Sequence, residues 1–406
     1  MDNLEFSQEN IKAQKKKYYA SFLWKLTVAI VIVISLQFII LIPVSVIKKM
    51  LLIAFTNPAS SLSGLFEYST FEKILSVLAA VIQLIVLTIT DGAGALFLYY
   101  MTKKTACSPM KRDMPFGYWL VTFLICFGLG GIFMLIGSIV ETIVLAPGTV
   151  IRTLFNNLLA AAPGNVVENI IYADDSWLYF FAQVLVAGIG VPIIEELFFR
   201  KLVIDNTSKY GFGAAVMISA FTFAAFHFNF RQFFYAFALG LLFAYVYAFT
   251  GKIKYTIAFH IGYNLYSALI MPVATRMMPK GTIESLLEST SLLSENLKAN
   301  PDMAMDAYNI FWEDLKGIAE TPGFIFGISV LLLVRLFYFF LIFVGIVLFV
   351  IFLHKAINVR KEMPMGEKGT KRCAAFNYGA VLFYVLSGTI FFVYYLIANI
   401  ASIFGG

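Results

Sequence analysis

Two adjacent carboxylates, Glu195 and Glu196, lie in the apolar stretch VPIIEELFFRKL, residues 191–202. Ionisable groups inside a bilayer are costly, and they usually have a pairing or functional role. Positions i and i+4 share a helix face, so we expect Glu196 and Arg200 to form an ion pair while Glu195 faces elsewhere. A desolvated carboxylate of this kind suits a general base. A purely structural Glu–Glu–Arg cluster that ties helices together is equally compatible with this motif alone.

Two further polar clusters follow along the chain. His227 lies near the end of ISAFTFAAFHFNFRQ, and His260 and Asn264 share a helix face in TIAFHIGYNL. An imidazole can donate, accept or bind a metal, and an amide can donate to a developing oxyanion. Each cluster is also explained by interfacial placement or by hydrogen bonds between helices. If these side chains converge with Glu195 on one cavity, they form a site that can activate water.

The composition is that of a membrane protein. The 406 residues are 60% hydrophobic and 13% charged, whereas soluble chains are about half apolar and a quarter charged. The net charge of +6 comes from basic residues in alternate loops and not from one long run, so a lipid bilayer and not a nucleic acid is the expected partner. The three cysteines have no CxxC or metal-like spacing, so we expect neither a cysteine zinc site nor a disulfide framework.

Hydropathy predicts an all-α fold, a polytopic integral membrane helical bundle of about eight to nine transmembrane helices, since each span needs about 20 apolar residues. The candidate spans are 24–47, 73–101, 116–146, 177–204, 211–230, 232–250, 255–272, 323–353 and 374–402. The glycine-rich pieces GLGGIF and VAGIGVP indicate close packing or kinking. Counting along the spans places His227 deeper than His260, so the clusters meet only if the helices start at different depths or if the 205–213 connection, DNTSKYGFG, dips into the bundle. Further charges within spans, with no spacing that links them to the clusters, are Asp91, Glu141 and Arg335.

The segments EELFFR, FTFAAFH and HIGYN resemble the three ordered motifs E-E-x-x-x-R, F-x-x-x-H and H-x-x-x-N/D of the CPBP intramembrane proteases. This family is named for CAAX-protein and bacteriocin processing and includes Abi and CAAX prenyl endopeptidase-like proteins. The resemblance covers roughly residues 177–272, and Lys201 departs from it where members often have glycine. It implies an intramembrane endopeptidase that cleaves a membrane-embedded or lipidated protein or peptide precursor.

The resemblance also implies residue roles. Glu195 matches the glutamate that activates water, and His227 matches its partner. His260 and Asn264 match the pair that stabilises the oxyanion, while Glu196 and Arg200 match the supporting acid and base. If the protease instead depended on zinc, Glu195, His227 and His260 would bind the metal, but no HExxH occurs and we favour no cofactor. Two further functional classes fit buried charges: a non-catalytic scaffold or bacteriocin-immunity protein, and a transporter, although no inverted repeat supports the last.

The expected organisation has five parts. They are a cytoplasmic N-terminal tail (1–22), N-terminal transmembrane helices and loops (23–176), a CPBP-like catalytic core (177–272), a polar acidic extracytoplasmic segment (273–322) and C-terminal transmembrane helices (323–406). Lys and Arg concentrate on one side of the alternating spans, which places the N-terminus in the cytoplasm. We therefore expect an integral multi-pass protein of a bacterial plasma membrane.

Overall fold

The computed structural model describes residues 2–56, 68–104, 106–145, 177–208, 211–227, 230–279, 282, 285 and 304–362. Within these ranges the chain is helical and contains no β-strand. Seven described segments are long and apolar enough to cross a bilayer, which confirms the predicted helical membrane bundle. They are Lys17–Thr56, Ile74–Thr102, Phe116–Val140, Trp177–Thr207, Gln232–Thr250, Ile253–Arg276 and Phe324–Phe352.

Two of the nine predicted spans are not among these seven. The predicted span 211–230 corresponds to α9 (Phe212–Phe226), a helix of 15 residues. At 1.5 Å per residue it is about 22 Å long, which is less than the roughly 30 Å of a bilayer core. The candidate span 374–402 lies outside the described residues.

The chain divides into two compact units, Met1–Asn264 with Leu341–Gly406, and Leu265–Phe340. Helices of the first unit are α1 (Asp2–Thr56), α2 (Tyr68–Thr102), α3 (Phe116–Leu145), α6 (Trp177–Gln183), α7 (Val191–Glu195), α8 (Val203–Thr207), α9, α10 (Phe230–Thr250) and α11 (Ile253–Leu265). Two π-helical turns, η1 (Val184–Gly190) and η2 (Glu196–Leu202), interrupt the rod that runs from α6 to α8. The second unit holds η4 (Tyr266–Ile270), α12 (Met271–Arg276), α14 (Ala304–Ala319) and the first part of α15 (Phe324–Glu362).

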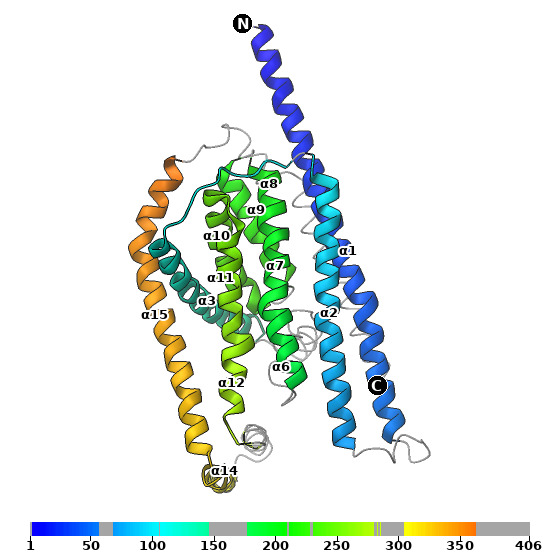
Figure 1. Ribbon diagram of the computed structural model, residues 1–406, viewed down its shortest axis with the longest axis vertical. Coiled ribbons are helices and arrows are strands. Elements are labelled where there is room, and N and C mark those ends of the chain that lie inside the picture. Colours follow the sequence, from blue (N-terminus) through cyan, green and yellow to red (C-terminus); the bar gives the residue numbers. More distant parts are fainter. Residues whose placement is uncertain are drawn as a thin grey trace. The chain divides into compact units, whose positions relative to one another are not determined.

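In the first unit, the interrupted rod lies between two groups of helices (Figure 1). On one side, α2 packs against α6, α7 and η2, and α1 packs against α2. On the other, α9 packs against η2 and α10, and α3 packs against α10. Phe198 and Phe199 of η2 join Phe22 of α1 and Phe223 of α9 in one buried cluster. Full burial of such a side chain contributes about 1.5–3 kcal/mol, so this cluster fixes η2 between its neighbours.

The π-helical turn η1 coincides with the glycine-rich stretch VAGIGVP. Pro192 follows it at the start of α7, and proline has no N–H to donate to the preceding turn. The turn widens there, and the Val191 N–H donates to the carbonyl oxygen of Val186, five residues earlier. Such widened turns occur frequently at functional sites because they change the direction in which later side chains point. Glu195 and Glu196 come immediately after this change.

Glycines also allow α3 and α15 to approach closely. A Cβ atom added at Gly128 would overlap the backbone of Gly345, so only glycine permits this crossing. Small residues at helix crossings are a typical means of packing in membranes, where hydrophobic burial does not drive association. The close packing predicted from GLGGIF is therefore present.

Candidate active site

The acid pair lies where α7 changes into η2. Glu195 is 7% exposed, and Glu196 and Arg200 are fully buried. Glu196 Oε2 lies 3.1 Å from Arg200 Nε, so the predicted ion pair is present. A buried charge without a partner is strongly destabilising, and this pairing is what allows both groups to be buried.

Two aromatic rings complete the environment of Arg200. Its guanidinium carbon lies 4.2 Å from the ring centroid of Phe223 and 5.4 Å from that of Phe243. The terminal nitrogens of Arg200 have no hydrogen-bond partner among the described residues, so these cation–π contacts supply much of the remaining stabilisation. A planar guanidinium can stack in this way while its Nε faces a carboxylate, which a lysine ammonium cannot do.

His260 of α11 bridges the two carboxylates. Its Nδ1 lies 3.0 Å from Glu196 Oε1, and its Nε2 lies 3.5 Å from Glu195 Oε2. A carboxylate accepts hydrogen bonds, so Glu196, paired with Arg200, holds the hydrogen on Nδ1 and orients the ring. The Nε2 atom is thereby directed to Glu195. Four side chains from η2, α7 and α11 form one continuous polar cluster in an otherwise apolar interior.

His227 immediately follows α9 and its side chain is half-buried. Its Nδ1 donates to the carbonyl oxygen of Phe223 at 2.9 Å, which turns the imidazole back by one helical turn. The ring of Phe223 contacts both imidazoles, with centroids 4.8 Å from His227 and 5.6 Å from His260. Span counting in the sequence predicted different depths for His227 and His260. Because α9 ends early and the His227 ring turns back toward it, both histidines lie against Phe223.

The contacts of His227 differ from the pairing that the family resemblance implies. Within the described part of the chain, the imidazole at ion-pair distance from Glu195 is that of His260 and not that of His227. His227 interacts electrostatically with His260 and Arg200, so it adjoins the cluster from the α9 side. Its role as a partner of Glu195 stays a prediction.

Asn264 lies one turn after His260 on the same face of α11. Its side chain is half-buried, and Nδ2 donates to the carbonyl oxygen of Ala187 at 3.2 Å. Ala187 belongs to η1, so α11 contacts the interrupted rod at two levels: at the acid pair through His260 and at the widened turn through Asn264. The six residues selected from the sequence all lie in the first unit.

Residues 177–266, which include all six of these positions, match the family model described as type II CAAX prenyl endopeptidase Rce1-like. The chain contains an Rce1-like domain. This confirms the predicted resemblance to the CPBP and CAAX proteases, and it supports a CAAX-type intramembrane protease in general. Comparison with curated proteins and with solved structures found no match.

A polar pair that the sequence motifs did not reveal lies on α1 and α2, and α2 packs against the Rce1-like domain. Gln37 of α1 donates through Nε2 to Asp91 Oδ1 of α2 at 3.0 Å, and both side chains are buried. Asp91 is close enough to Glu195 to interact with it electrostatically. The only signal in the sequence was a charge inside a predicted span, because Asp91 lies 86 residues before the start of the domain at residue 177 and no local spacing connects them.

Lys201 departs from the family pattern but does not enter the polar cluster. Its ammonium group pairs with Asp205 one turn later and donates to Ser108 Oγ at 2.7 Å. Ser108 in turn donates to Asp205 at 2.7 Å, and Tyr247 of α10 donates to the other oxygen of Asp205 at 2.8 Å. Lys201 thus fastens the loop after α2 to the end of the interrupted rod, where η2 continues into α8.

A zinc site does not fit this arrangement. Among the described residues, no group of three or more His, Cys, Asp and Glu side chains is placed to hold a metal ion. Both ring nitrogens of His260 face carboxylates, and Nδ1 of His227 donates to a backbone carbonyl.

Proposed function

We propose that the Rce1-like domain hydrolyses peptide bonds within the membrane by means of a water molecule activated by Glu195. The observation that carries this proposal is the bridge formed by His260, with Nδ1 on Glu196 and Nε2 facing Glu195. A carboxylate in a low-dielectric interior, next to an oriented imidazole, is a suitable general base. The guanidinium of Arg200 also balances the charge of Glu196, which makes a buried pair of this kind sustainable.

In the proposed reaction, Glu195 accepts a proton from water while the water oxygen attacks the scissile carbonyl carbon. The carbonyl oxygen becomes an oxyanion, which Asn264 and His260 stabilise. The C–N bond then breaks, and the proton held by Glu195 passes to the leaving amine. A positioned general base contributes about 10²–10⁴-fold to the rate, and one oriented donor to an oxyanion contributes about 3–4 kcal/mol.

The proposed substrate is a membrane-associated or lipidated protein, or a peptide precursor. The matched family is described as CAAX prenyl endopeptidases, so a prenylated peptide that ends in a CAAX sequence is the first substrate to test. The buried position of the cluster supports a substrate that reaches it through the membrane region, since Glu195 is only 7% exposed.

The experiment is a comparison of protein termini in membranes that contain wild-type protein or the Glu195→Gln variant. The matched control is Glu72→Gln, which changes an exposed glutamate on α2. New N-termini that appear with wild type and Glu72→Gln but vanish with Glu195→Gln support the proposal. Identical termini in all three samples would instead favour a scaffold or immunity protein, provided that all three proteins insert equally.

Chelation distinguishes the metal-free reaction from a zinc-dependent one. We expect the purified protein to retain activity after exhaustive chelation, because the described residues offer no cluster that fits a metal. A requirement for stoichiometric zinc in turnover would contradict this mechanism while leaving the assignment as a protease intact.

A further inference from the structure

Helix α14, in the second unit, separates apolar and polar side chains onto two faces. With 3.6 residues per turn, one arc carries Met305, Tyr308, Phe311, Trp312, Leu315 and Ile318. The opposite arc carries Asp306, Asn309, Glu313, Lys316 and, just beyond the helix, Glu320. Ile310 is the one apolar side chain on the polar arc. A pattern of this kind indicates a helix that lies between an apolar and an aqueous environment.

In the part of the chain that the structure describes, protein covers one flank of the apolar arc. Phe311, Leu315 and Ile318 are half-buried. On the other flank Tyr308 is 47% exposed, Trp312 57% and Met305 74%. This outer flank, which consists of Met305, Tyr308 and Trp312, therefore presents two aromatic rings away from the protein.

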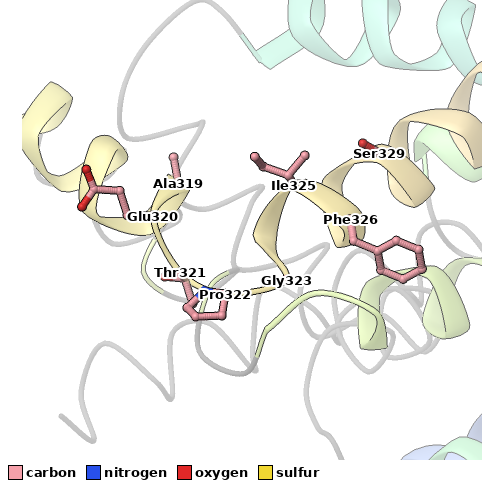
Figure 2. Close-up of a pocket in the computed structure, with 8 residues that line it drawn as sticks. All are labelled: Ala319, Glu320, Thr321, Pro322, Gly323, Ile325, Phe326 and Ser329. Carbon is pink, nitrogen blue, oxygen red and sulfur yellow. The ribbon is translucent and has the colours of Figure 1, made fainter.

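A tight elbow joins α14 to a membrane span. Gly323 has a φ of +85°, a conformation that favours glycine. The Phe324 N–H donates to the Thr321 carbonyl oxygen at 3.0 Å, so the bend is hydrogen-bonded. Figure 2 shows this elbow, where Pro322 and Gly323 separate Ala319 from Phe326 along a shallow pocket. Figure 1 shows α14 nearly end-on at the start of α15, so α14 runs across the axis of α15.

The elbow fixes the level at which α14 lies. Phe324–Phe352 of α15 is one of the segments long and apolar enough to span a bilayer. The link 320–323 reaches at most about 14 Å even when fully extended. A helix that crosses the end of a span within this distance can reach the boundary between lipid headgroups and acyl chains. Tyrosine and tryptophan are enriched at that boundary because one end of each ring system is apolar and the other polar.

We propose that α14 is an interfacial helix whose outer flank, Met305, Tyr308 and Trp312, inserts into the lipid surface of the bilayer. The occupant of this face is therefore the membrane itself. The inference is independent of the proteolytic function. It assigns a role to the C-terminal part of the acidic segment 273–322, which is to fasten that segment to the membrane beside the start of α15.

The charge of α14 indicates how it is held there. Helices that bind membranes from solution are usually basic on their polar face, whereas this polar face has more acids than bases. Attraction to anionic lipid therefore does not hold it. The short covalent link to α15 keeps the helix at high effective concentration next to the bilayer, so burial of the apolar flank is sufficient in a zwitterionic lipid.

Tryptophan fluorescence in phosphatidylcholine nanodiscs tests this placement. The chain has four tryptophans, so the difference between wild type and Trp312→Phe isolates the emission of Trp312. We expect nanodiscs containing phosphatidylcholine brominated near the headgroup end of its acyl chains to quench this difference, and aqueous iodide to leave it largely unquenched. Quenching by iodide alone would show an aqueous position, and quenching by neither would show burial against protein. Either result would overturn the proposal.

Two tryptophan substitutions, each measured as the difference in emission from the Trp312→Phe background, test the orientation of the helix. In the Trp312→Phe background, Tyr308→Trp places the probe on the outer flank and Asn309→Trp places it on the polar arc. Both positions are exposed, so neither substitution needs space in a core. Brominated lipid should quench the first and iodide the second. Equal responses from both probes would contradict an orientation that faces lipid.

Discussion

Replacement of Arg200 by methionine tests whether an ion pair holds Glu196 in the interior. Arg200 is fully buried, and its Nε lies 3.1 Å from Glu196 Oε2. Methionine fills much of the same apolar space but leaves Glu196 as a buried carboxylate without its cation. Breaking a buried pair in this way costs about 3–5 kcal/mol. Loss of the cation–π contacts with Phe223 and Phe243 adds to the cost.

The double variant Arg200→Met with Glu196→Gln separates the pair from its individual charges. Removal of both charges from a buried pair is often close to neutral in stability, so the double variant should regain most of what the single variant loses. The assay is the free energy of unfolding of the purified protein in detergent, measured for wild type, both single variants and the double variant. Their double-mutant cycle gives the interaction energy directly.

Activity should not recover along with stability. A glutamine at position 196 can accept from His260 Nδ1, but the hydrogen bond is then no longer made to a charged group. A hydrogen bond to a charged group contributes about 1.5–3 kcal/mol, which is roughly a tenfold to 150-fold loss of rate at 1.36 kcal/mol per factor of ten. An Arg200→Met variant as stable as wild type, or a double variant no more stable than that single variant, refutes the ion-pair reasoning. Full recovery of cleavage in the double variant refutes the role given to the charge of Glu196.

Two further variants test the packing around the site. Gly128→Ala should lower the free energy of unfolding by about 1–3 kcal/mol, because the new Cβ overlaps the Gly345 backbone. The control is Gly117→Ala, which should lose no stability because the added Cβ meets nothing within 4 Å. Equal stability of the two variants would contradict the close crossing of α3 and α15. Gln37→Leu should lower the free energy of unfolding by about 1–3 kcal/mol because it leaves the buried Asp91 without its hydrogen-bond donor. An unchanged unfolding curve for this variant in detergent would show that the hydrogen bond does not contribute to stability.

Local spacing in the sequence predicted those parts of the site that lie on a single helix. The i, i+4 relation gave the ion pair between Glu196 and Arg200 and the shared face of His260 and Asn264, both of which are present. Hydropathy gave the spanning helices in the same way, because burial in lipid requires an uninterrupted apolar run.

Relations between helices were not predictable in this way. Spacing along one helix says nothing about the register of α11 against α7, so it did not indicate that His260 would be the imidazole next to Glu195. The end of α9 at Phe226 left only a weak signal, since His227 and Asn229 suit a helix C-terminus but the stretch from Phe221 to Phe230 contains no glycine or proline. Asp91 was recognised only as a charge in a span, because its partner Gln37 lies on a separate helix.

The most direct measurement of the central claim is cleavage of a prenylated CAAX peptide by the purified protein in proteoliposomes. Wild type, Glu195→Gln and the surface control Glu72→Gln are compared at equal concentrations of folded protein. If Glu195 activates the attacking water, Glu195→Gln loses about 10²–10⁴-fold in kcat/KM, while Glu72→Gln cleaves like wild type. Cleavage by Glu195→Gln at the wild-type rate, from a sample shown to be free of contaminating protease, would contradict the account.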